Sequence, residues 1–552
     1  MRTRRRAVPR IVAMRRIFRL LLIVSLLSIF GYSEATTASA ATATSYYRAV
    51  APTRVFDSSI NGRVAANQPV SIGVVGSGQV PAGSTAAVLS VIASSPSAAG
   101  GLIFHASGTV TPLQSMMTLP PVGSSRVQTV VVPLGADGKV EVLSSAAVDL
   151  SVDVVGFYAS ASSSRSGRYR AIADTKVVDR STVIVPVGGE VEVKVPDGVG
   201  RDAEAVVLTV SVSGAIRNGS WWLSSMGVTR PVASGRLGES ASNTVIARPT
   251  NGALKLSTDS GGFVVVTVSG WYTGRSASSG SDGLFVAQSP MRLVDTTSSL
   301  DPLGAGVALH SNWTLEAPVL GLAGVPATGV GAVAVVVATS NTMGSGATTA
   351  YAAGQARPAT SHVLASRAGN RASVTLNVSV GDRGVAVFSA PGADVTVDVV
   401  GWFTGTAKTS VVVKPINVMP TAATFPGLLW VPDLRLFTSV REDTSWVNLD
   451  PSHLPESRSP NQPGNVAIFG HRTSHGHEFR NLDRMKQGSL IVLAVGGAVY
   501  WYRTTSVEVL SPEDPLLYST NSNDQTITLV ACHPPGSVKF RIVVRASLVS
   551  VT

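Results

Sequence analysis

Cys532 is the single cysteine of the 552-residue chain and the side chain best suited to covalent chemistry. It closes the run Thr526–Cys532, whose alternation predicts a β-strand with Thr528, Val530 and Cys532 on one face. The Pro-Pro pair two residues later ends such a strand, because proline cannot donate to the hydrogen-bond ladder. The sequence therefore predicts a thiol at a strand end, beside a loop that a substrate can reach.

A thiol needs a base or a cation beside it, because only a few per cent of a free cysteine is ionised near neutral pH. The best histidine is His471, which follows the strand-like run Gly464–Phe469 and opens a loop. Its imidazolium would stabilise the thiolate and later protonate a leaving amine. Arg541 lies on the next strand-like run after Cys532, and a hairpin would bring its positive charge to a developing oxyanion.

These candidates belong to a C-terminal module that we place at residues 411–552. So many strand-like runs in a short module predict a small closed β-barrel. The runs are Gly427–Leu436, Asn465–Phe469, Ser489–Val495, Val499–Thr504, Ser506–Leu510, Thr526–Ala531 and Phe540–Val549.

Four motifs of this module, taken in order, resemble the sortase family, and most of all its class E group from actinobacteria. They are the entry segment Leu429–Leu436, the histidine segment Gly464–Thr473 with Phe479–Asp483, the signature Thr528–Pro534, and Arg541 nine residues after the cysteine. The resemblance implies an eight-stranded barrel. It also implies Cys532 as nucleophile, His471 as general acid and base, and Arg541 as the group that stabilises the oxyanion or substrate.

The activity that the resemblance implies is transpeptidation. A sortase cleaves a threonyl bond in an LPxTG- or LAxTG-like sorting signal of a surface protein, and passes the acyl group to an amine on peptidoglycan precursor or a pilin. One position departs from the pattern, because Ala531 replaces the threonine that usually precedes the cysteine. This departure bears on local packing or on substrate preference.

Three other interpretations of the module stay open. One alternative is a transition-metal site, because the spacing of five side chains could hold a metal ion: His471, His475, His477, Cys532 and His533. The predicted thiol mechanism needs no metal and no cofactor. The protein could instead be an adhesin or wall-binding protein whose barrel has lost activity. Water rather than an amine could also resolve the acyl-enzyme, which would make the module a hydrolase.

Upstream, one motif occurs three times, and we place the copies at residues 46–158, 169–273 and 284–405. Each copy opens with an aromatic residue and a basic residue three places before an aspartate, and closes with glycine and two aromatic residues. Short β-branched runs between turns predict antiparallel β-sandwiches or barrels, so the whole chain is predicted to be all-β. The linkers at 159–167 and 276–283 have the composition of flexible tethers.

The copies resemble a repeat of secreted actinobacterial proteins. Their basic–acidic pairs are Arg54 with Asp57, Lys176 with Asp179, and Arg292 with Asp295. Such a pair can be a contact that defines the fold, or it can bind a cell-wall saccharide with the help of nearby aromatic residues. The sequence alone does not separate these two roles.

Residues 1–40 predict an export signal, with eight arginines by residue 19, an apolar run Leu20–Tyr32, and a cleavage site after Ala40. An uncleaved anchor is the alternative. This segment carries +7 of the formal charge of +11, so the other 512 residues carry only +4 and show no basic cluster. Nucleic-acid binding is therefore not expected. We expect an exported protein on the outer face of the membrane or in the cell wall.

Overall fold

The computed structural model describes residues 43–551, except 78, 298–307, 310, 382–383, 409–426, 435, 449, 461, 496–497 and 518–523. The predicted export signal at residues 1–40 lies outside the described residues, as does the start of the C-terminal module. Among the residues described, no helix combines the length and the apolar character needed to cross a bilayer.

The first repeat is a sandwich of two antiparallel layers, with strand orders β1-β8-β3-β6 and β2-β7-β4-β5. Through the pairing of Ser45 with Phe285, the first layer continues into the third repeat as one eight-stranded sheet. Strands β1 and β8 hold the opening and closing motifs and lie side by side. The elements are β1 (Ser45–Asp57), α2 (Ser58–Asn61), β2 (Pro69–Gly73), β3 (Ser84–Ser94), β4 (Gly101–Ala106), β5 (Met117–Thr118), β6 (Ser125–Pro133), β7 (Lys139–Ser144) and β8 (Asp149–Ser160).

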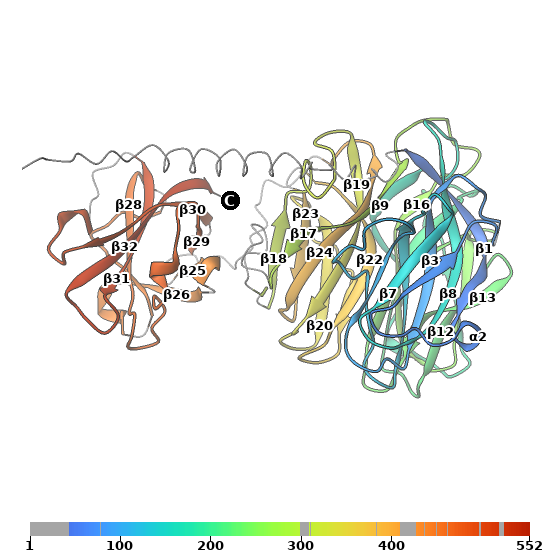
Figure 1. Ribbon diagram of the computed structural model, residues 1–552, viewed down its shortest axis with the longest axis horizontal. Coiled ribbons are helices and arrows are strands. Elements are labelled where there is room, and N and C mark those ends of the chain that lie inside the picture. Colours follow the sequence, from blue (N-terminus) through green and yellow to red (C-terminus); the bar gives the residue numbers. More distant parts are fainter. Residues whose placement is uncertain are drawn as a thin grey trace, which may run out of the picture. The chain divides into compact units, whose positions relative to one another are not determined.

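The second and third repeats have the same topology, so the predicted all-β architecture is confirmed (Figure 1). The second contains β9 (Tyr169–Val185), β10 (Glu190–Lys194), β11 (Ala205–Ser213), β12 (Gly219–Ser225), β13 (Val228–Gly235), β14 (Ala241–Ala247), β15 (Ala253–Thr258) and β16 (Gly262–Tyr272). The third contains β17 (Phe285–Asp295), β18 (Trp313–Ala317), β19 (Val330–Ser340), β20 (Gly346–Ala352), β21 (Val363–Ala365), β22 (Ala372–Ser379), β23 (Val385–Ser389) and β24 (Asp394–Thr404).

The aromatic residues of the repeat motif form one buried cluster that the three copies share. The opening ring of each copy packs against the closing ring of the next, and the third copy packs back onto the first. The centroid distances are 4.4 Å for Tyr47–Tyr272, 4.6 Å for Tyr169–Phe403 and 4.3 Å for Phe285–Tyr158. Because this pairing closes on itself, the repeats are one body with a common core.

The glycine of each closing motif makes room for an opening ring. A Cβ atom on Gly156 would lie 2.3 Å from the Tyr47 hydroxyl, and one on Gly270 would lie 2.5 Å from the Tyr169 ring. Such distances are far below van der Waals contact, so any side chain at either position would displace a buried tyrosine. The Gly-aromatic-aromatic motif is therefore a packing motif.

The prediction of flexible tethers is wrong for both serine-rich linkers. The Gly167 carbonyl accepts from the Tyr47 amide at 2.8 Å, and the Gly167 amide donates to the Thr273 carbonyl at 2.7 Å. In the second linker the Gly283 carbonyl accepts from the Tyr169 amide at 2.8 Å. Each linker is thus bonded to an opening strand, which holds it in place although its composition is typical of a loose tether.

The basic–acidic pair of the opening motif is an internal contact. Arg54 Nε donates to Asp153 Oδ1 on β8 at 2.5 Å, and its Nη1 pairs with Asp57. Asp57 Oδ1 also accepts from the Ser59 amide at 2.9 Å and so begins the short helix α2. These bonds use the pair to join the two motif strands, which favours the structural role over sugar binding.

The third copy follows the same rule, whereas the second departs from it. Arg292 donates to Asp398 at 2.5 Å and pairs with Asp295. In the second copy, Lys176 replaces the arginine and lies opposite Thr267, where the other copies have an aspartate. The second copy therefore lacks both the fork-shaped guanidinium and the carboxylate on the facing strand that this guanidinium bonds in the other copies.

The C-terminal module is a closed eight-stranded barrel of order β25-β26-β27-β28-β31-β32-β30-β29, as predicted. Two of its pairings are parallel, β26 with β27 and β28 with β31. Its strands are β25 (Gly427–Val431), β26 (Leu436–Glu442), β27 (Ser452–His453), β28 (Gly464–Phe469), β29 (Leu490–Val495), β30 (Ala498–Leu510), β31 (Gln525–His533) and β32 (Phe540–Val551). Short 3-10 helices are η1 (Pro432–Leu434), η2 (Thr444–Trp446), η3 (Leu482–Arg484) and η4 (Pro515–Leu517).

Candidate active site

Cys532 is the second-last residue of β31, which ends at His533 as the Pro-Pro pair predicted. The side chains of Ile527, Leu529 and Ala531 lie in the barrel core. Val530 packs in a separate small cluster, which places the intervening residues on the opposite face. The thiol of Cys532 is partly exposed at the strand end, where a substrate can reach it.

Arg541 lies directly opposite Cys532 in the antiparallel ladder between β31 and β32. The structure therefore brings together the cysteine and the arginine that the hairpin predicted. Arg541 Nη1 donates to the carbonyls of Val538 and Phe540, at 2.9 and 3.1 Å. Both bonds use Nη1 alone and fix the guanidinium at the turn of this hairpin.

His471 reaches the same end of the barrel from a neighbouring strand. Strand β28 runs parallel to β31, with Phe469 level with Val530, and the Gly470 amide donates to the Val530 carbonyl at 3.1 Å. His471 follows the last residue of β28 by two positions and so begins the loop at the end of the barrel where Cys532 lies. The structure thus brings the three predicted residues to one end of the barrel, with Cys532 and Arg541 on paired strands and His471 in the loop after β28.

The ring of His471 has a hydrogen-bond partner on each nitrogen. Nε2 donates to Asn448 Oδ1 at 2.8 Å, since an amide oxygen can only accept. Nδ1 then accepts from the Ser474 hydroxyl at 3.2 Å, so both bonds fit a neutral imidazole. Sequence reasoning missed Asn448, because the loop that holds it shows no local pattern that points to a histidine 23 residues away.

Burial lowers the pKa of His471, and the neighbouring His475 lowers it further, whereas Glu478 raises it. The rings of His471 and His475 are 4.8 Å apart at their centroids. A lowered pKa keeps His471 neutral at neutral pH, which is the form that can take a proton from a thiol.

We expect two loop substitutions to move the acidic limb of the pH–rate profile in opposite directions. His475→Ala removes a group that depresses the pKa of His471, so the limb moves to higher pH. Glu478→Gln removes a group that raises it, so the limb moves to lower pH. Histidine NMR titration and kcat/KM measured across pH check both shifts, with His477→Ala as the loop control. Shifts of the same sign in the two variants would contradict the assignment.

Arg472, next to the histidine, is a buried connector that sequence reasoning gave no role. It is 3% exposed, and its Nη1 donates to His533 Nδ1 at 2.8 Å. Its Nη2 donates to the Arg480 carbonyl at 3.0 Å and also pairs with Asp483. Arg472 therefore ties the histidine loop to the residue after Cys532 and acts as a positioning residue. The sequence does contain one signal for this role, because Asp483, which pairs with Arg472, lies in the motif segment Phe479–Asp483.

Thr528 of the cysteine signature is an anchor within the barrel. It is 1% exposed, and its hydroxyl donates to Asn465 Oδ1 at 2.7 Å. Thr526 donates to the same oxygen at 3.1 Å, so Asn465 joins the histidine strand to the cysteine strand. Ala531 is 3% exposed and packs in the barrel core. The position that departs from the family pattern therefore lies in the core and not at the exposed edge of the site.

The histidine loop also bears on the metal-site alternative. In the described part of the chain, no three or more His, Cys, Asp or Glu side chains gather where they could hold a metal ion. His533 of the proposed ligand set is instead bonded to Arg472 through Nδ1.

Comparison with known proteins assigns this module. Residues 429–549 match the family model of the sortase domain. Sortase SrtE1 of Streptomyces coelicolor is 29% identical over 104 residues, which cover 17% of this chain but only 28% of that relative.

Two solved sortase structures resemble part of the chain. Sortase A from Corynebacterium diphtheriae is 26% identical, with 24% of this chain and 61% of that chain covered and a TM-score of 0.22. Sortase E1 from Streptomyces coelicolor with a tripeptide in its active site is 24% identical, with 24% and 93% covered and a TM-score of 0.22. The resemblance predicted from the four motifs is confirmed by the family match: residues 429–549 of the chain are a sortase domain.

Proposed function

We propose that the protein is a cysteine transpeptidase that acts on the sorting signals of surface proteins. The observation that carries the proposal is the register of the barrel, which sets Arg541 opposite Cys532 and brings His471 to the same strand ends. A nucleophile, a base and a fixed cation at one accessible edge are the groups that acyl transfer through a thioester needs.

The first half-reaction forms the acyl-enzyme. Neutral His471 takes the proton of the Cys532 thiol, and the thiolate attacks the threonyl carbonyl carbon of the bound signal. Arg541 donates to the oxyanion of the tetrahedral intermediate. The C–N bond then breaks, His471 returns its proton to the leaving amine, and the threonyl group stays on sulfur as a thioester.

The second half-reaction releases the product. An amine attacks the thioester carbonyl, His471 takes its proton, and the C–S bond breaks to give a new amide and the free thiolate. Asn448 supports both steps because its oxygen holds the imidazole by Nε2–H. The acceptors we propose are amines of peptidoglycan precursor or of a pilin, and the signal is of the LPxTG or LAxTG type. The substrates lie outside the cell, so the proposal includes export by residues 1–40.

The test uses residues 41–552 with fluorogenic LPxTG and LAxTG peptides, each with and without glycine or diaminopimelate as amine. We expect thiol-dependent cleavage and a product whose mass includes the amine. Because Cys532 is the only cysteine, alkylation of the protein by iodoacetamide should stop cleavage by modifying one residue. Cleavage without amine incorporation would make the module a hydrolase. A folded protein that cleaves no peptide of a wider panel would instead support the adhesin interpretation.

A further inference from the structure

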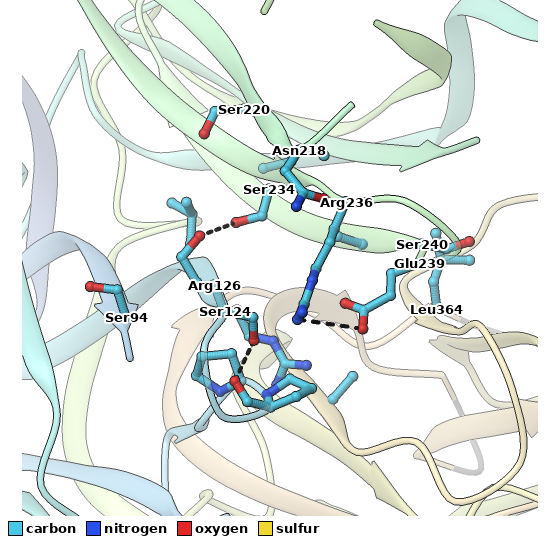
Figure 2. Close-up of a pocket in the computed structure, with 18 of the residues that line it drawn as sticks. Ser94, Ser124, Arg126, Asn218, Ser220, Ser234, Arg236, Glu239, Ser240 and Leu364 are labelled. Atoms are coloured by element: carbon cyan, nitrogen blue, oxygen red, sulfur yellow. Dashed lines mark hydrogen bonds and ion pairs between the residues drawn. The ribbon is translucent and has the colours of Figure 1, made fainter. Parts of the chain in front are cut away.

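A cavity of about 430 Å³ lies where the three repeats meet, and it belongs to no single copy (Figure 2). Strands β6, β14 and β22 hold the same place in the three repeats and are all edge strands; β6 and β22 are the two edges of one eight-stranded sheet, and β14 is an edge of a four-stranded sheet. The first residues of all three strands line this cavity. Its volume falls within the range of about 300–1,000 Å³ that is usual for small-molecule sites.

The cavity wall is rich in hydroxyl and amide groups. Among the described residues that line it are Ser94 and Ser124 from the first repeat, Asn218 and Ser234 from the second, and Asn370 from the third. No aromatic side chain is among the lining residues that the structure describes. The asparagine oxygens and the Ser124 hydroxyl already bond the protein, so a ligand would use the asparagine NH₂ groups and the remaining capacity of the hydroxyls. The wall has no ring on which a flat ligand could stack, so its free polar groups favour a small polyhydroxylated molecule.

The charged groups of the wall are unbalanced. The described lining residues include two arginines, Arg126 and Arg236, and one carboxylate, Glu239. Figure 2 shows the ion pair of Arg236 with Glu239. Arg236 Nη1 is 3.7 Å from Glu239 Oε1, and this distance is too long for a hydrogen bond. The Nη1 atom is buried and has no hydrogen-bond partner. A buried guanidinium nitrogen with unused donors is costly, so an acceptor brought into the cavity would be stabilised there.

Arg126 adds to the same positive field. Burial lowers the pKa of its guanidinium to about 10, the carboxylate of Glu239 raises it, and the nearby Arg371 lowers it again. Three bonds hold Arg126 in place. Nη1 donates to the Thr118 carbonyl at 3.0 Å and to the Thr118 hydroxyl, and Nη2 donates to the Arg371 carbonyl at 2.8 Å. Its charge is thus fixed at the wall with too little negative charge around it.

We propose that this cavity is a binding site for an acidic sugar, meaning a monosaccharide unit that carries a carboxylate or a phosphate. Arg236 and Arg126 attract the anionic group, and the serine and asparagine side chains bond the sugar hydroxyls. The basic–acidic pairs of the first and third copies are engaged within the fold and are not among the residues that line this cavity, so the proposed sugar site is separate from them. The proposal does not depend on the activity of the barrel.

Calorimetric titration of the full chain with D-glucuronate, glucose 6-phosphate, D-glucose, acetate and inorganic phosphate tests this site. We expect the two acidic sugars to bind more tightly than glucose, acetate or phosphate. Arg236→Gln should weaken that binding at least about tenfold, because a charge-assisted hydrogen bond is lost. Glu239→Gln should strengthen it, because the competing carboxylate is gone. Arg180→Gln, at an exposed arginine of the same repeat, should leave it unchanged.

Three results would overturn the proposal. Equal binding of acetate or phosphate would mean an anion site without sugar recognition, and equal binding of glucose would remove the role of the arginines. Equal effects of Arg236→Gln and Arg180→Gln would place the sugar elsewhere. Thermal unfolding of each variant separates lost binding from lost folding, and the opposite sign expected for Glu239→Gln cannot arise from general destabilisation.

Discussion

Replacement of Cys532 by alanine should abolish peptide cleavage, with a loss of at least about a thousandfold in kcat/KM. The chain contains no other thiol, so no neighbouring cysteine can replace the nucleophile. The substitution should barely affect folding, because the side chain is only partly buried at a strand end. Wild-type protein mixed with a poor amine acceptor should gain the mass of the acyl group, and the variant should not.

Two controls make this result specific. Cys532→Ser keeps the size of the side chain and should show the same mass-spectrometric loss of thioester. His533→Ala changes the next residue and removes the acceptor of the Arg472 bond, so it should reduce the rate without removing the acyl-enzyme. Cleavage that survives in Cys532→Ala would rule out the thiol mechanism.

The barrel was largely predictable because its chemistry is tied to local patterns. The alternation of β31, its end at the Pro-Pro pair, and Arg541 nine residues later are all readable from one short hairpin. The contacts of Asn448 and Arg472 were not predictable. They join residues 23 and 61 positions apart, and only the closed barrel brings those residues together.

The repeats show a different limit of sequence reasoning. The opening and closing aromatic residues were visible as a motif, but the motif does not state which copy supplies each partner ring. The composition of the serine-rich linkers predicts flexible tethers. In the structure, Gly167 and Gly283 are instead bonded to the opening strands of the repeats. The composition of a linker indicates how flexible it is as an isolated segment. It does not indicate the hydrogen bonds that neighbouring strands make with that linker in the folded protein.

Tyr272→Ala should destabilise the repeat body by about 3–5 kcal/mol, the usual cost of removing a large buried aromatic side chain. Tyr272 is fully buried and lies in ring contact with Tyr47, Tyr158, Tyr169 and Phe403. Its hydroxyl is also 2.6 Å from that of Tyr158. Tyr272→Phe keeps the ring and should cost only about 1 kcal/mol.

The set of strands in which Tyr272→Ala speeds hydrogen exchange tests whether the repeats are one body. If the cyclic aromatic pairing holds them together, Tyr272→Ala should speed hydrogen exchange in β1 and β8 of the first repeat and in β24 of the third, as well as in its own β16. Faster exchange confined to β9–β16 would mean three independent sandwiches. Tyr46→Ala, one residue before Tyr47 and only partly buried, should leave exchange in the other copies unchanged. The comparison separates a shared core from a local defect, since both variants remove one tyrosine.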